Sequence, residues 1–286
     1  MTIIDALTDA QRRLAQSGID TPRLDAEVLL SHVLGRSRAD LYLSRSDSLS
    51  KDALSRFDDA VARRSARCPV AYITGTKEFW SIPIRVTPAV LIPRPETETV
   101  VEESLRHFVD RSKPIRLLDI CTGSGCVAAA LASELPNAGI FVSDSSLAAI
   151  EMARENLAFA GSRVTLLSGD LFEPVAQMKD GFDLITANPP YIAEEEYQSL
   201  QPEIRDNEPK AALIAGKSGL DFILRIIEDA PRFLLPGGWL VMEVGENQAP
   251  ECKVQAIGQG SYDTVACAAD LAGIERVVAL RKNMFG

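Results

Sequence analysis

Apolar residues in the first part of the chain recur at the spacing of amphipathic helices. The first predicted helix runs from Thr2, which can cap it, to Gly18. Its apolar positions lie three or four residues apart: Ile3, Leu7, Ala10 and Leu14. Three more helices are predicted at 21–34, 38–43 and 50–67. Together they predict a small helical domain over residues 1–74.

From Val70 the helical period gives way to short extended pieces, and five prolines lie between residues 69 and 95. Proline cannot donate a hydrogen bond to a neighbouring strand, so this stretch is not typical of a central strand. We predict a β-hairpin that serves as a linker over residues 75–98.

Beyond residue 99, short apolar runs alternate with helical patterns. The runs predict strands at 116–120, 141–144, 164–167, 183–187 and 239–245, and two weaker strands toward the C-terminus. Helices are predicted at 128–134, 147–160 and 219–234, and near Gln248. Such alternation favours an α/β fold, in which a doubly wound, mostly parallel sheet of seven strands carries helices on both faces.

Composition narrows the class of protein. The 286 residues are 46% hydrophobic and 24% charged, with no apolar run of membrane-spanning length and no basic leader at the N-terminus. Five cysteines form no paired framework, and two histidines are too few to suggest a zinc site. The net charge of −10 lacks the basic excess of a non-specific duplex binder. We therefore expect a cytoplasmic protein.

The strand predicted at 183–187 ends in Asn188-Pro189-Pro190-Tyr191. In an open α/β sheet, ligands bind at the carboxyl ends of the strands. The amide of Asn188 offers a hydrogen-bond acceptor, neither proline has an N–H, and Tyr191 offers a flat ring. These residues would form a cradle for a planar –NH2 group. The alternative is an ordinary turn after a strand.

A glycine-rich loop, Cys121-Thr122-Gly123-Ser124-Gly125, joins the strand at 116–120 to the helix at 128–134. Asp144 ends the next strand, 19 residues after Gly125, where a carboxylate that binds a ribose diol is expected. This pattern predicts a cofactor that contains adenosine, and it fits NAD as well as S-adenosylmethionine.

Across nearly its whole length the chain resembles the protein-(glutamine-N5) methyltransferases of peptide chain release factors. These enzymes belong to the class I S-adenosylmethionine-dependent methyltransferases. The matching segments are Tyr72–Gly75, Glu78–Trp80, Leu91–Glu98, Asp119–Cys126, Asn188–Ile192, Glu208–Pro209, Gly219–Asp221, Glu243–Gly245 and Asn247–Gln248. The most specific of these is Ile92-Pro93-Arg94-Pro95-Glu96-Thr97-Glu98.

The resemblance assigns roles to single residues. It implies that residues 121–125 hold S-adenosylmethionine, that Asp144 binds its ribose, and that Asp170 and Leu171 border its adenine. It implies that Asn188, Pro189, Pro190 and Tyr191 hold the glutamine amide, with Asn188 also next to the cofactor. The family usually has glycine where this chain has Cys121, and some relatives have an aromatic residue where it has Leu171.

The resemblance also implies an activity and a partner. We expect methylation of a glutamine on an exposed loop of a release factor, which would tune translation termination. Residues 1–74 would recognise the substrate, 75–98 would link the parts, and 99–286 would carry catalysis. We expect a monomer without direct contact to nucleic acid or membrane. A DNA amino-methyltransferase, an NAD-dependent oxidoreductase and a non-catalytic cofactor-binding protein are the alternatives.

Overall fold

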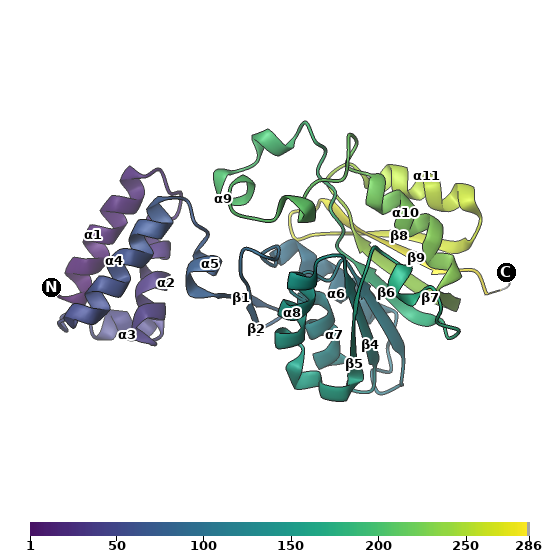
Figure 1. Ribbon diagram of the computed structural model, residues 1–286, viewed down its shortest axis with the longest axis horizontal. Helices are drawn as coiled ribbons and strands as arrows, with labels where there is room; N and C mark the ends of the chain where they lie inside the picture. Colours follow the sequence, from purple (N-terminus) through teal and green to yellow (C-terminus); the bar gives the residue numbers. More distant parts are fainter. Residues whose placement is uncertain (285–286) are drawn as a thin grey trace. The chain divides into compact units, whose positions relative to one another are not determined.

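The computed structural model describes residues 1–284, and the chain forms two compact units (Figure 1). The first unit, called the helical unit below, comprises Met1–Thr76 and Gln201–Asn207. The second, called the sheet unit, comprises Lys77–Leu200 and the chain from Glu208 onward. No helix within residues 1–284 is both long enough and apolar enough to cross a membrane.

Five of the helices in the helical unit come from the N-terminal segment: α1 (Ile3–Gln16), α2 (Pro22–Leu34), α3 (Arg38–Leu43), α4 (Lys51–Ser65) and α5 (Val70–Thr74). The first four confirm the predicted helices. Thr2 caps α1 by accepting a hydrogen bond from the Asp5 N–H, and the Asp5 carboxylate accepts one in return from the Thr2 N–H. Apolar side chains of α1, α2 and α4 form the core of this unit, among them Leu14, Leu29 and Phe57.

The extended pieces predicted from Val70 onward are wrong for residues 70–74. These residues form α5, which follows Pro69 and ends at Gly75 in the left-handed conformation. Tyr72 and Ile73 are buried, and Ile73 packs into the core of the helical unit. Burial of these side chains outweighs the preference of a β-branched, aromatic segment for strand.

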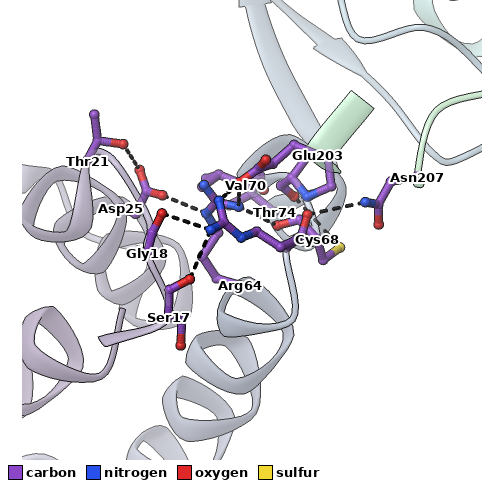
Figure 2. A network of polar contacts seen from close by, with 12 residues as sticks. Ser17, Gly18, Thr21, Asp25, Arg64, Cys68, Val70, Thr74, Glu203 and Asn207 are labelled. Atoms are coloured by element: carbon purple, nitrogen blue, oxygen red, sulfur yellow. Dashed lines mark hydrogen bonds and ion pairs between the residues drawn. The ribbon is translucent and has the colours of Figure 1, made fainter. Parts of the chain in front are cut away.

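Charged residues hold the distant segment 201–207 in the helical unit (Figure 2). Arg64 of α4 donates to Asp25 Oδ2 of α2 over 2.6 Å and to Glu203 Oε1 over 3.1 Å. Glu203 belongs to the short helix α9 (Pro202–Arg205), and it also accepts from Arg67 over 3.1 Å. The network therefore ties α2, α4 and α9 together.

A two-stranded hairpin follows α5. It consists of β1 (Thr76–Phe79) and β2 (Ile82–Arg85), and all of it except Thr76 belongs to the sheet unit. Its turn consists of Trp80 and Ser81, both at positive φ, which is the geometry of a tight two-residue hairpin turn. A loop and a 3-10 turn (Pro95–Thr97) follow, and then α6 (Glu98–Arg106), a helix that the hydrophobic pattern did not reveal.

The main sheet has seven strands in the order β5-β4-β3-β6-β7-β9-β8. The parallel strands are β3 (Arg116–Ile120), β4 (Gly139–Asp144), β5 (Val164–Ser168), β6 (Phe182–Ala187) and β7 (Leu234–Glu243). The antiparallel strands are β8 (Tyr262–Ala269) and β9 (Glu275–Lys282). The predicted mostly parallel sheet of seven strands is confirmed.

Helices cover both faces of this sheet (Figure 1). On one face α7 (Cys126–Glu134) contacts both α6 and α8 (Leu147–Asn156), and on the other α10 (Asp221–Asp229) packs beside α11 (Ala249–Gln259). The helix predicted at 219–234 is shorter than expected: α10 ends at Asp229, a 3-10 turn that contains Pro231 follows at Ala230–Arg232, and β7 begins at Leu234. Leu234 pairs with Phe182, and a register shift takes up residues 235–238 before Trp239 pairs with Leu184.

Candidate active site

From β3 the chain adds β4 and β5 on one side, and then returns to add β6 and β7 on the other side of β3. The strands β3 and β6 are therefore neighbours in the sheet although they are far apart in the sequence. Ile120 at the end of β3 pairs with Ala187 at the end of β6. Cys121 and Asn188 therefore leave adjacent strands at the same edge, at a topological switch point where doubly wound proteins bind ligands.

A cavity lies at this switch point, and all of its lining residues belong to the sheet unit. Three groups of residues form its wall. The first comes from the glycine loop and the ends of β4 and β5, the second from the loop before α6, and the third from the segment that follows β6. The lining residues used below are Arg94, Thr97, Asp119, Cys121, Thr122, Gly123, Ser124, Asp144, Leu171, Asn188, Pro190, Pro209 and Phe222.

The backbone of the glycine loop turns sharply around a carboxylate. Gly123 and Gly125 have φ values of +55° and +78°, and Cys121 adopts φ +55° although it is not glycine. A Cβ at Gly125 would lie 3.1 Å from Ala153 Cβ, so glycine also permits the close approach of α8. The Gly123 N–H donates to Asp144 Oδ2 over 2.9 Å. Burial raises the pKa of Asp144, and backbone N–H donors oppose that rise.

The Asn188 side chain is tied to the loop before α6. Its Nδ2 donates to Thr97 Oγ1 over 3.2 Å, and no residue within 1–284 donates to its Oδ1. Tyr191 is not among the residues that line the cavity, and its hydroxyl donates to Glu243 Oε1 over 3.1 Å. The Tyr191 carbonyl accepts from Gln248 Nε2 over 2.9 Å, which fixes the backbone after the two prolines.

Two further acids are buried near these groups. Asp119 lines the cavity and accepts from the hydroxyls of Thr122 and Thr186 over 2.5 and 2.7 Å. Burial raises its pKa to about 6 despite these two donors. Glu243 at the end of β7 is 2% exposed, and burial raises its pKa as well. Its Oε2 has no hydrogen bond of regular geometry to any residue in the described part of the chain.

The loop before α6 is held by a buried ion pair. Arg94 pairs with Glu208, which is 6% exposed, and Glu208 Oε2 also accepts from the Ile92 N–H over 3.2 Å. Arg94 and Pro209 both line the cavity. The pair therefore joins two walls of the cavity that are more than a hundred residues apart in the sequence.

The structure brings together most of the residues that sequence analysis named for the site. Eight of them line the cavity: Cys121, Thr122, Gly123, Ser124, Asp144, Leu171, Asn188 and Pro190. Gly125, Asp170, Pro189 and Tyr191 do not line it. Asp170 instead pairs with Arg225 of α10 over 2.6 Å, at the surface.

Sequence analysis assigned no role to Thr97, Asp119 or Glu243. Asp119 and Glu243 lie toward the carboxyl ends of strands, which is a signal that could have identified them. No pattern in the sequence indicates that Thr97 contacts Asn188, 91 residues further along the chain.

Comparison with known proteins places this geometry in a family. Residues 5–75 match the family model described as the PrmC N-terminal domain, and residues 103–206 match the methyltransferase small domain. The release factor glutamine methyltransferase of Geobacter sulfurreducens is 43% identical to this chain over 98% of the chain and 96% of its own length. The protein of the same name from Vibrio cholerae is also 43% identical, over 97% of this chain and 96% of its own length.

A solved structure supports the fold. A methyltransferase from Pyrococcus furiosus superposes with a TM-score of 0.51, at 18% identity, over 80% of this chain and 99% of its own. At this identity the likeness concerns the fold alone, and the fold is that of a methyltransferase.

Proposed function

The chain belongs to the release factor glutamine methyltransferase family, and from that membership we propose the reaction that it catalyses. It transfers a methyl group from S-adenosylmethionine to the side-chain amide nitrogen of a glutamine in a peptide chain release factor. The observation that carries this proposal is the position of Asn188. No residue within 1–284 donates a hydrogen bond to its Oδ1. Asn188 lines the same cavity as the glycine loop and Asp144.

The cavity fits S-adenosylmethionine through the chemistry of its lining. The Asp144 carboxylate already accepts from the N–H groups of Gly123 and Ser146, and its oxygens have lone pairs left for a ribose diol. Leu171 and Phe222 add apolar surface for a flat base. We assign cofactor binding to residues 121–125, Asp144 and Leu171. The salt bridge of Asp170 to Arg225 places Asp170 at the rim of this set.

A glutamine amide is a weak nucleophile because its nitrogen lone pair is delocalised into the carbonyl. S-adenosylmethionine supplies the methyl group as an electrophile on a positively charged sulfur. Asn188 Oδ1 accepts a hydrogen bond from the substrate –NH2 and holds its nitrogen in line with the methyl carbon and the sulfur. As the nitrogen–carbon bond forms, the carbon–sulfur bond would break and leave its electron pair on sulfur as a neutral thioether. Positive charge then grows on the nitrogen, and Asn188 Oδ1 stabilises it. The surplus proton then leaves the nitrogen for water.

Release factors are the partners that the names of the relatives indicate. The glutamine must lie on a loop that can extend from the body of its protein, because a cavity of this kind does not admit a side chain from a packed surface. We assign the helical domain, residues 1–74, to the body of the partner, the segment 75–98 to linking the parts, and the rest of the chain to catalysis.

The proposal is tested by incubating the protein with labelled S-adenosylmethionine and a release factor, followed by mass spectrometry of the product. The label is expected on one glutamine nitrogen. Asn188→Ala should lower turnover by roughly 10²–10³-fold, which is the effect of removing one preorganised polar group at a reacting centre. A matched control is Asn137→Ala, because Asn137 is exposed and its side chain donates, within residues 1–284, to the Ser112 carbonyl alone. Label on another residue type, or normal turnover of Asn188→Ala, would refute the proposal.

A further inference from the structure

A chain of buried polar groups lies behind Asn188, on the side away from its unengaged oxygen. Thr97 and Glu243 are each 2% exposed, and Tyr191 donates to Glu243 from the same segment that carries Asn188. Asn188 Nδ2 donates to Thr97 Oγ1 over 3.2 Å, and the Thr97 hydroxyl lies within reach of the Glu243 carboxyl. Burial raises the pKa of that carboxyl, and the contact with Thr97 opposes the rise. Glu243 Oε2 has no regular hydrogen bond within residues 1–284, so it has capacity for one more donor.

With Glu243 ionised, the form that its donors Tyr191 and Thr97 favour, counting donors and acceptors sets the direction of these hydrogen bonds. A threonine hydroxyl has one proton and two lone pairs, and a carboxylate can only accept. A buried carboxylate oxygen without a donor is costly, so the single Thr97 proton is best used on Glu243. Thr97 Oγ1 can then only accept from Asn188. The side of the Asn188 amide that faces Thr97 must therefore be its –NH2 group, and Oδ1 must face the cavity.

We propose that Thr97 and Glu243 are positioning residues that set the orientation of the Asn188 carboxamide. This inference rests on the proposed function. The hydrogen bonds through Thr97 and Glu243 make Asn188 an acceptor toward the substrate. A flipped Asn188 would present its own –NH2 to the –NH2 of the glutamine, and the two donors would repel each other. The same orientation disfavours glutamate, because a substrate carboxylate has no proton to donate to Asn188 Oδ1.

Three variants separate this role from a structural one. Glu243→Gln has the same size, but its –NH2 can donate to Thr97 Oγ1 and release the Thr97 proton toward Asn188. Thr97→Val keeps the shape and removes the hydroxyl, whereas Thr97→Ser keeps the hydroxyl. Glu103→Gln is a matched control, since Glu103 is a buried acid of the sheet unit that pairs with Arg106 at 2.8 Å.

We expect Glu243→Gln and Thr97→Val to lower kcat for the glutamine substrate by about 10–100-fold, and Thr97→Ser to restore kcat to within about threefold of wild type. Cofactor affinity should change less than threefold in all three variants. The thermal midpoint of Glu243→Gln should be equal to or above that of wild type, because burial disfavours the charge on Glu243. A structural role would instead lower stability and activity together. In the variant that combines Glu243→Gln with Thr97→Val, kcat should be little lower than in either single variant.

A readout that does not depend on turnover is the side-chain amide signal of Asn188 in nitrogen-15 NMR, assigned with Asn188→Asp. It should be shifted and protected from exchange in wild type and in Thr97→Ser, and lose both properties in Thr97→Val. If wild type methylates no glutamine, the proposed function fails and this signal still decides the orientation. If wild type is active but Thr97→Val or Glu243→Gln keeps its full kcat, or the signal does not respond to Thr97→Val, the inference is wrong.

Discussion

Replacing Arg64 by alanine should weaken the helical unit far more than an ordinary surface substitution would. The side chain of Arg64 is 9% exposed, and its guanidinium donates to Asp25 Oδ2, to Glu203 Oε1 and to the Cys68 carbonyl (Figure 2). After the substitution, Asp25 stays buried, with 9% of its side chain exposed. Among the described residues it keeps one side-chain donor, the Thr21 hydroxyl, over 2.8 Å. Glu203 keeps its bond to Arg67.

Removing one partner of a buried ion pair costs about 3–5 kcal/mol, because an uncompensated charge remains. The free energy of unfolding should fall by about 3 kcal/mol, the lower end of this range, because Glu203 still pairs with Arg67. A unit of roughly 80 residues is expected to have about 4–12 kcal/mol of stability in total. The substitution should therefore remove a large fraction of the stability of the helical unit.

The tryptophans make this measurable within the full chain. Trp80 and Trp239 are the two tryptophans of the chain, and both lie in the sheet unit, so their fluorescence follows that unit. Far-ultraviolet circular dichroism follows the helices of both units. In urea, Arg64→Ala should shift an early dichroism transition to lower concentration and leave the fluorescence transition in place.

Arg56→Ala is the control on the same helix. Arg56 pairs with Asp52 at the surface, with side chains 58% and 79% exposed, and such pairs contribute at most about 1 kcal/mol. A loss below about 1 kcal/mol for Arg64→Ala, or a loss equal to that of Arg56→Ala, would contradict the assigned role of the buried network.

Three further predictions concern the sheet unit. Asp144→Asn should weaken S-adenosylmethionine binding by about 10–100-fold in titration calorimetry, because a charged acceptor contributes about 1.5–3 kcal/mol; unchanged affinity would show that Asp144 does not bind the ribose. The pKa of Asp119 is about 6 in the fold against 3.8 as a free side chain, so its contribution to stability is complete below about pH 4 and is lost as pH rises through about 6. Urea unfolding should show wild type losing up to about 3 kcal/mol against Asp119→Asn over that range, and a difference that does not vary with pH would contradict this. Gly219→Ala should lower the free energy of unfolding by at least about 2 kcal/mol. The added Cβ would lie 2.3 Å from the Tyr191 carbonyl oxygen, and residue 219 has a φ of +75°. A stable variant with full activity would show that the backbone can shift to relieve this contact at little cost.

The fold was predictable wherever apolar residues keep a regular spacing over several helical turns or fill a whole strand. Leu14 lies on the buried stripe of α1, and the apolar runs of β3 and β6 are buried because helices cover both faces of a parallel sheet. The misses are short elements. Five residues, 70–74, carry too little periodicity to distinguish a helix from an extended piece, and burial of Ile73 decides between them.

The site was predictable where it follows from sheet geometry. Asn188 and Asp144 come at or directly after strand ends, and any parallel sheet brings such residues to one edge. Contacts between distant loops were not predictable. The bond between Asn188 and Thr97, and the pair of Arg94 with Glu208, depend on how two long loops pack, and no local pattern encodes that packing.

The chemistry of the cavity also accounts for an amide, and not a carboxylate, at position 188. Asp119 and Asp144 already line this cavity, and burial together with the charge of Asp144 raises the pKa of Asp119 to about 6. A third carboxylate at 188 would be driven to bind a proton by the same forces. Its hydroxyl would then donate toward the substrate –NH2, which reverses the polarity that methyl transfer requires. Asn188 accepts without titrating. In the orientation that we propose, the acid Glu243 lies one hydroxyl away, where the donors Tyr191 and Thr97 oppose the rise of its pKa that burial causes.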